Sequence, residues 1–124
     1  MRRLFWVALL VLGLVALASG AEAAVLSWTD NSTNEAGFAV ERQLGVCTAP
    51  DAFVEIGSVG VDVSGYVDLG PVEGNHYCYR VRAFNFAYNG DASSIQYSGY
   101  SNKAQYDFPR PAPAAPSLLG AQAQ

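Results

Sequence analysis

The stretch that decides the fold class of this chain is His76-Tyr77-Cys78-Tyr79-Arg80-Val81-Arg82-Ala83-Phe84-Asn85. Read with the two-residue period of a strand, its odd positions form an apolar, aromatic face: Tyr77, Tyr79, Val81 and Ala83. Its even positions form a cationic face: Cys78, Arg80, Arg82 and Phe84. The first face suits a core and the second suits water, so the pattern predicts a β-strand over residues 76–85.

Five more segments read as strands, namely residues 24–29, 37–42, 53–59, 63–68 and 100–106. Glycine-containing turn signals separate them at the spacing of an all-β protein, and no segment has the period of a helix. The inward positions of these strands give a predicted core of aromatic and β-branched side chains: Trp28, Phe38, Val40, Tyr66, Tyr77, Tyr79 and Val81.

The first 23 residues have the order of a secretory signal peptide: two arginines, an apolar run over residues 4–17, then small residues. We expect cleavage after Ala23, with Ala18 as the alternative. The apolar run is shorter than the roughly 20 residues of a membrane span. We therefore expect a secreted or periplasmic protein. The whole chain has a formal net charge of −4, which gives no electrostatic basis for binding nucleic acid.

The two cysteines of an exported chain are most simply explained by one disulfide, Cys47 to Cys78. Such a bond closes a loop of about 30 residues, which is worth roughly 3–4 kcal/mol in the loop-entropy treatment. Two cysteines and one histidine fall short of a zinc site, so no metal is expected there.

Taken together and in order, five pieces of the chain resemble the bacterial branch of the fibronectin type III family. They are Leu26-Ser27-Trp28-Thr29-Asp30-Asn31-Ser32, Gly37-Phe38-Ala39-Val40-Glu41-Arg42, Tyr66-Val67-Asp68, Tyr77-Cys78-Tyr79-Arg80-Val81-Arg82-Ala83-Phe84-Asn85 and Tyr100-Ser101-Asn102-Lys103-Ala104. The resemblance implies an immunoglobulin-like, two-sheet antiparallel sandwich of about six or seven strands over residues 24–106. It also implies that Trp28 lies in the core and that the Tyr77 hydroxyl is bonded to backbone just upstream.

The expected cleavage falls where this family carries its first strand, so that strand is short or missing. Three alternatives remain: the domain does without it, cleavage at Ala18 leaves a few more residues, or another segment covers the edge of residues 24–29. An uncovered edge could accept a strand from a partner, which gives a structural or assembly role.

The connection over residues 86–99 is long for a hairpin and is the main candidate binding loop, through Phe86, Tyr88 and Tyr97. Aromatic rings among Ser, Gly and Asn are typical of evolved binding loops. The expected ligand is an envelope or extracellular protein or a polysaccharide. The alternative is that these rings fold back on the domain.

The sequence contains no recognisable catalytic constellation, so no enzyme activity and no cofactor are expected. The acidic and amide side chains of Asp30, Asn31, Asn34 and Glu35 lack the spacing of a calcium loop. Residues 107–124 are rich in Pro and Ala and are expected to form a disordered tail that acts as an extended spacer.

Overall fold

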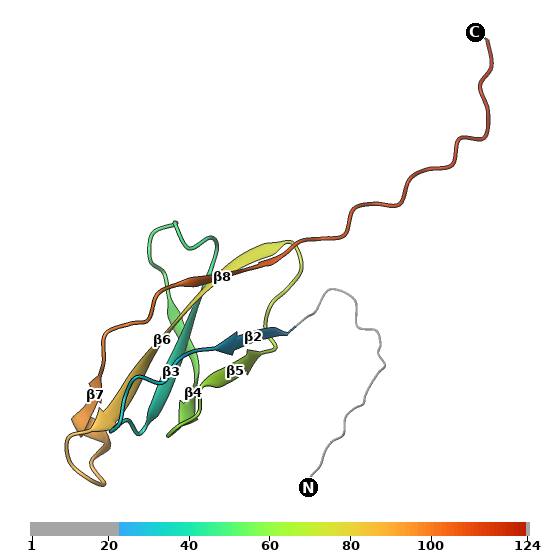
Figure 1. Cartoon of the computed structure of the whole chain (residues 1–124). Helices are drawn as coiled ribbons and strands as arrows, with labels where there is room; N and C mark the ends of the chain where they lie inside the picture. The colour runs from blue at the N-terminus through green and yellow to red at the C-terminus, as the bar shows by residue number, and fades with distance from the viewer. Residues whose placement is uncertain (1–22, 124) are drawn as a thin grey trace, which may run out of the picture.

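Seven strands and one short 3-10 helix form the regular structure of residues 23–123, the part of the chain that this computed structural model describes (Figure 1). Their bounds are β2 Ala24–Ser27, β3 Gly37–Leu44, β4 Val54–Gly60, β5 Gly65–Asp68, β6 Asn75–Phe86, η1 Ala92–Ser94, β7 Ile95–Tyr97 and β8 Ala104–Phe108. The expected signal peptide lies outside the described residues apart from Ala23. Within the described range, no helix is both long and apolar enough to cross a membrane.

The strands form two antiparallel sheets (Figure 1). The smaller sheet pairs β2 with β5, and the larger has the order β4-β3-β6. Both remaining strands pair with the long strand β6, β7 with residues 84–86 and β8 with residues 75–79. The all-β prediction is confirmed, and the two sheets are open rather than closed into a barrel.

The core lies between the inward faces of the two sheets. The β3–β6 register pairs Val40 with Val81, and both side chains are buried. Leu26 of β2 packs against these residues, and Ala24 packs against Tyr77 and Tyr79. All seven predicted core residues take part in these clusters: five are buried, whereas Trp28 and Tyr66 are half-buried at the margin.

A buried polar group also joins the two sheets. Arg42 shares the inward face of β3 with Phe38 and Val40, and its Nη1 lies 2.8 Å from Oδ2 of Asp68 in β5. The hydroxyl of Tyr79 in β6 donates to the same oxygen at 2.6 Å. Three strands from both sheets therefore meet at one carboxylate.

The Tyr77 hydroxyl makes the backbone contact that the family resemblance implied. It accepts a hydrogen bond from the Val72 backbone N–H at 2.7 Å, and the Asn75 side-chain amide donates to it at 3.2 Å. Tyr77 thereby ties the turn before β6 to the core side of that strand.

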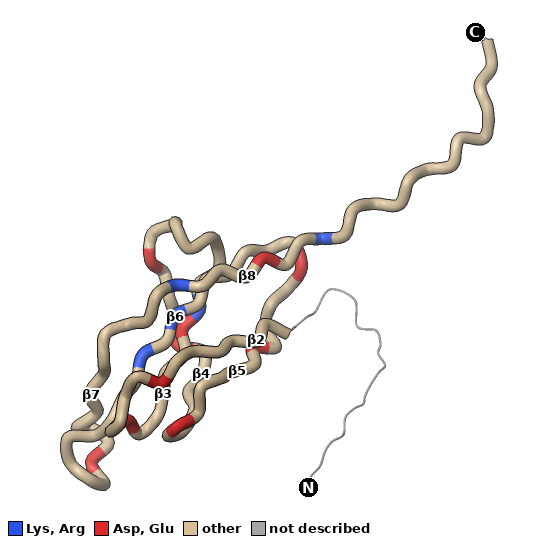
Figure 2. Tube along the Cα trace, viewed as in Figure 1, with Lys and Arg blue, Asp and Glu red and all other residues tan. Residues whose placement is uncertain are grey.

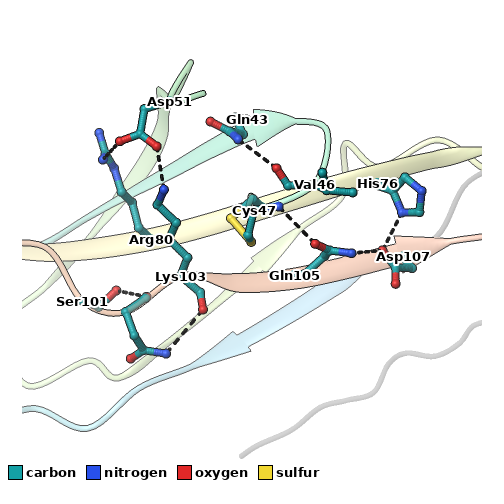
Figure 3. Close-up of a disulfide and its surroundings, with 12 residues drawn as sticks. Gln43, Val46, Cys47, Asp51, His76, Arg80, Ser101, Lys103, Gln105 and Asp107 are labelled. Atoms are coloured by element: carbon teal, nitrogen blue, oxygen red, sulfur yellow. Dashed lines mark hydrogen bonds and ion pairs between the residues drawn. A yellow bond between two sulfur atoms is a disulfide. The ribbon is translucent and has the colours of Figure 1, made fainter. Parts of the chain in front are cut away.

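The outer face of the large sheet is not the solvated surface that the alternation suggested. The predicted Cys47–Cys78 disulfide is present and holds the loop of residues 45–53 against this face, so that Cys78 is fully buried (Figure 3). Gln43 fixes the same loop, because its Oε1 accepts from the Ala52 N–H at 2.8 Å and its Nε2 donates to the Val46 carbonyl. A charged strand face is here covered by the protein's own loop.

The connection after β6 is shorter than the predicted 86–99 loop. Residues 95–97 form β7 and pair with residues 84–86, so the hairpin continues past Phe86. Only residues 87–94 make the turn, which includes η1 with Asp91 as its N-cap. The predicted last strand, 100–106, is likewise displaced to Ala104–Phe108.

Candidate binding site

A groove of about 790 Å³ runs between β2 and β8, the two strands that flank the gap between the sheets. One wall is residues 24–29, and the other is formed by Ser101, Asn102 and residues 104–106. Tyr79 and Val81 of β6 contribute to its lining, so the groove reaches the core of the molecule. Apolar side chains from the core and polar side chains such as those of Asn31 and Gln105 therefore border a space that opens to solvent.

The backbone of β2 presents unpaired groups to this groove. The Trp28 N–H donates to the Ser64 carbonyl at 3.0 Å. Because bonded and non-bonded pairs alternate along an antiparallel ladder, the backbone groups of Ala24 and Leu26 also point toward β5. Those of Val25 and Ser27 point the opposite way, and no strand among residues 23–123 pairs with that edge.

The groove results from the absence of a strand beside β2 in the described range. β2 pairs only with β5, and β8 pairs only with β6, so two sheet edges face each other without hydrogen bonding. The sequence left three alternatives for the edge of residues 24–29, and an uncovered edge was one of them. It did not predict that β8 would form the opposite wall, because the last strand was placed too early in the chain.

An apolar pair lies on the outside of the small sheet, next to the groove. Val25 and Val67 are cross-strand partners, and their side chains are 76% and 53% exposed. Both valines lie on the solvent side of the two-stranded sheet. They extend the apolar character of the groove around the free edge of β2.

The three predicted binding-loop residues have different surroundings. The Tyr97 ring lies under the Arg82 guanidinium, 3.7 Å from its Cζ, and Phe86 packs edge-on against Phe84 with ring centroids 6.0 Å apart. Tyr88 is 71% exposed, and within residues 23–123 no ring contact involves its side chain. The rings of Phe86 and Tyr97 thus partly fold back, while Tyr88 projects from the tip.

Tyr97 belongs to a stack of alternating cations and rings on the outer face of the large sheet. Arg82 lies between Tyr97 and Tyr100, and Arg80 lies between Tyr100 and Phe53, with Cζ-to-centroid distances of 3.6–4.7 Å. Glu41 lies beneath the stack, 2.8 Å from Arg80 Nε, and accepts from the Tyr100 hydroxyl at 3.0 Å. These charges are neutralised within the protein, and Figure 2 shows them gathered over β3 and β6.

The loops beside β3 bring three carboxylates together: Asp30, Glu35 and Asp62, with one oxygen of each within 4.8 Å of the others. The backbone N–H of Asp62 donates to Glu35 at 3.0 Å and is the main reason that the pKa of Glu35 falls to about 2. The negative charge of Glu35 in turn raises the pKa of Asp62. Such oxygens could hold a hard cation, and the sequence had singled out only Asp30 and Glu35 among them.

His76, the only histidine of the chain, lies at the surface with its Nδ1 2.6 Å from Asp107 of β8 (Figure 3). A hydrogen bond from His76 lowers the pKa of Asp107. This pair fastens the start of β6 to β8.

Comparison of the chain with known protein families and with curated proteins finds no match.

Proposed function

We propose that this chain is an exported, non-catalytic binding module of the fibronectin type III kind that accepts an extended polypeptide strand beside β2. The observation that carries the proposal is the groove between β2 and β8, which combines a backbone edge left unpaired within residues 23–123 with a lining of both apolar and polar side chains. An added strand would bond to the edge through its main chain and place alternate side chains in the groove.

Three observations support this assignment over one centred on the loop at the end of β6. The groove reaches buried core residues, so its occupation would remove apolar surface from water. The edge strand β2 is neither charged nor interrupted by proline, the usual devices that block strand addition. The disulfide supports an oxidising compartment outside the cytoplasm, where such a partner would be an envelope or extracellular protein.

The test is a selection of random linear peptides displayed on phage against the secreted protein. We expect enriched peptides with alternating apolar residues, and we expect Ser27→Pro to weaken their binding at least tenfold. Proline at position 27 removes an N–H that points into the groove while leaving the β2–β5 bonds intact. Ser27→Ala is the matched control, because it removes the side chain and keeps the N–H.

A second candidate function is recognition of a polysaccharide or protein through the aromatic tip formed by Phe86, Tyr88 and Tyr97. The specific observation is the 71% exposure of Tyr88, whose ring is available for stacking. Binding that is lost in Tyr88→Ala and retained in Ser27→Pro would establish the tip and refute the groove. Enriched peptides that bind equally well to both variants would refute both.

A further inference from the structure

Residues 117–123 form no helix or strand of their own in the structure. The segment contains no proline and no charge, and Leu118 and Leu119 are 88% and 100% exposed. Arg110 is the last charged residue of the sequence, and Figure 2 shows that the end of the described chain carries no charged residue. Two adjacent leucines fully in water stand out in a segment that is otherwise small and polar.

A proline-rich spacer separates this segment from β8. Residues 109–116 contain Pro109, Pro111, Pro113 and Pro116. Such a spacer is extended and semi-rigid at about 3.1 Å per residue, so it carries the segment roughly 25 Å from the end of β8. Figure 1 shows it running away from both sheets. Because the groove lies alongside β8, the spacer directs residues 117–123 away from the groove of their own molecule.

The alternation of the segment matches the two apolar surfaces beside β2. As a strand, it would place Leu119, Ala121 and Ala123 on one face and Leu118, Gly120 and Gln122 on the other. With the first face turned inward, Leu119 meets the groove residues Leu26 and Val81. Leu118 then lies on the outer surface beside Val25, with Val67 one strand further across the small sheet. Both leucines gain apolar neighbours in a single register.

We propose that residues 117–123 of one molecule add as a strand to β2 in the groove of a second copy of this chain. The inference rests on the proposed function and names its partner. Because tail and groove are different surfaces, the contact is heterologous, and it joins molecules head to tail into rings or open chains. Neither the tail segment nor β2 carries charge, and the one charged residue that lines the groove is the cation Arg80, so the acidic character of the protein does not oppose the contact locally.

The test uses one variant that can only donate the tail strand and one that can only accept it at β2. Ser27→Pro keeps the tail and blocks the edge, whereas a chain ended after Pro116 keeps the edge and lacks the strand. We expect the secreted wild type to form concentration-dependent oligomers in sedimentation velocity and each variant alone to be monomeric. We expect the equimolar mixture of the two variants to give a 1:1 heterodimer. Leu119→Asp lies outside the folded sheets and should also abolish assembly, which guards against misfolding of Ser27→Pro.

Several outcomes would overturn the inference. Oligomers that survive truncation after Pro116, or a wild type that stays monomeric, exclude the tail as a strand donor to a second copy. A monomeric wild type whose Val25 and Ser27 amides lose protection from hydrogen exchange on truncation would show that the tail occupies its own groove. If the truncated chain still binds groove-selected peptides while the wild type is monomeric, the proposed function stands and this inference fails. If it binds no peptide, both fail.

Discussion

At the scale of single residues, this protein depends on side-chain polar groups that form hydrogen bonds with backbone groups outside the strand ladders. Tyr77 shows the principle: its ring is in the core, and its hydroxyl accepts the Val72 N–H of the turn before β6. A partly buried backbone donor without an acceptor costs free energy, so the hydroxyl matters more than its size suggests. The sequence pointed to this bond only through family resemblance, because periodicity indicates a face and not a partner.

We predict that Tyr77→Phe lowers the free energy of unfolding by about 1 kcal/mol, the usual net value of such a hydrogen bond. The ring and its core packing are kept, so the fold persists. Tyr88→Phe is the matched control, since Tyr88 is exposed and should leave stability unchanged. Denaturant midpoints measure both variants. Equal stability of Tyr77→Phe and wild type would mean that water replaces the hydroxyl.

At the scale of elements, the segment between β7 and β8 is held to β6 by side chains as well as backbone. The hydroxyls of Ser98 and Ser101 accept from the Ala83 and Val81 N–H groups at 2.9 Å. Their own N–H groups donate to the carbonyls of the same two residues. The two serines thus replace regular ladder pairs. Because each serine directly follows a tyrosine, these bonds also place Tyr97 against Arg82 and Tyr100 against Arg80.

We predict that the double variant Ser98→Ala/Ser101→Ala loses about 2 kcal/mol of stability, roughly 1 kcal/mol for each hydrogen bond. Hydrogen exchange at the Val81 and Ala83 amides should accelerate in the variant relative to amides of the β3–β4 ladder. Ser58→Ala, an exposed change in β4, is the control for loss of a serine and should have no effect. Unchanged exchange at both amides would contradict the role assigned to these serines.

The disulfide acts at the same scale, because it fastens the loop of residues 45–53 across β6. We predict that Cys47→Ala/Cys78→Ala lowers the free energy of unfolding by about 3 kcal/mol, as expected for a loop of this length. Thermal unfolding of the variant, compared with wild type before and after reduction, measures the effect. Reduction should lower the Tm of wild type and leave the variant unchanged. A variant as stable as oxidised wild type would show that Gln43 and the Arg80 stack suffice to hold the loop.

The elements that the sequence predicted best are the long alternating ones. β3 and β6 were found because Phe38, Val40, Tyr77, Tyr79 and Val81 recur with the period of a strand. β7 was missed because Ile95-Gln96-Tyr97 is too short to show a period. The sequence also did not predict that the loop of residues 45–53 packs on the outer face of the large sheet. Which loop packs on a cationic strand face depends on tertiary contacts, which periodicity does not show. An edge of β2 that no described strand covers was one of the alternatives that the sequence left open, but the groove required the position of β8.

At the scale of the whole molecule, one buried carboxylate holds the two sheets together beside the core. Asp68 is bonded by Tyr79 from β6, by Arg42 from β3 and by the Gly70 N–H, and its side chain is 8% exposed. The small sheet has only two strands, which is too few for independent stability. Its position against β3 and β6 therefore depends on the core and on this polar contact, and the groove beside β2 depends on that position.

This contact makes stability depend on pH through Asp68. Burial alone would raise the pKa of Asp68, but the hydrogen bonds from Tyr79, Gly70 and Arg42 outweigh burial and lower it. A carboxyl whose pKa is lowered by folding stabilises the fold above its unfolded pKa of about 4. That contribution is lost as the pH falls through the lower pKa of the folded state.

We predict that Asp68→Asn is about 3 kcal/mol less stable than wild type at pH 7, because it leaves the Arg42 charge without its partner. The difference should narrow as the pH falls below about 4, since the wild type then loses the same charge. Denaturant midpoints of both proteins across this pH range measure the difference in stability. Subtracting the variant's profile from that of the wild type removes the contributions of Glu35, Asp51 and Asp107, whose pKa values are also lowered. Glu55→Gln, an exposed change in β4 that also exchanges a carboxyl for an amide, is the control and should leave stability at pH 7 nearly unchanged. Parallel pH profiles for wild type and Asp68→Asn would mean that the ionised carboxylate does not hold the sheets together, and that the groove is positioned by apolar packing alone.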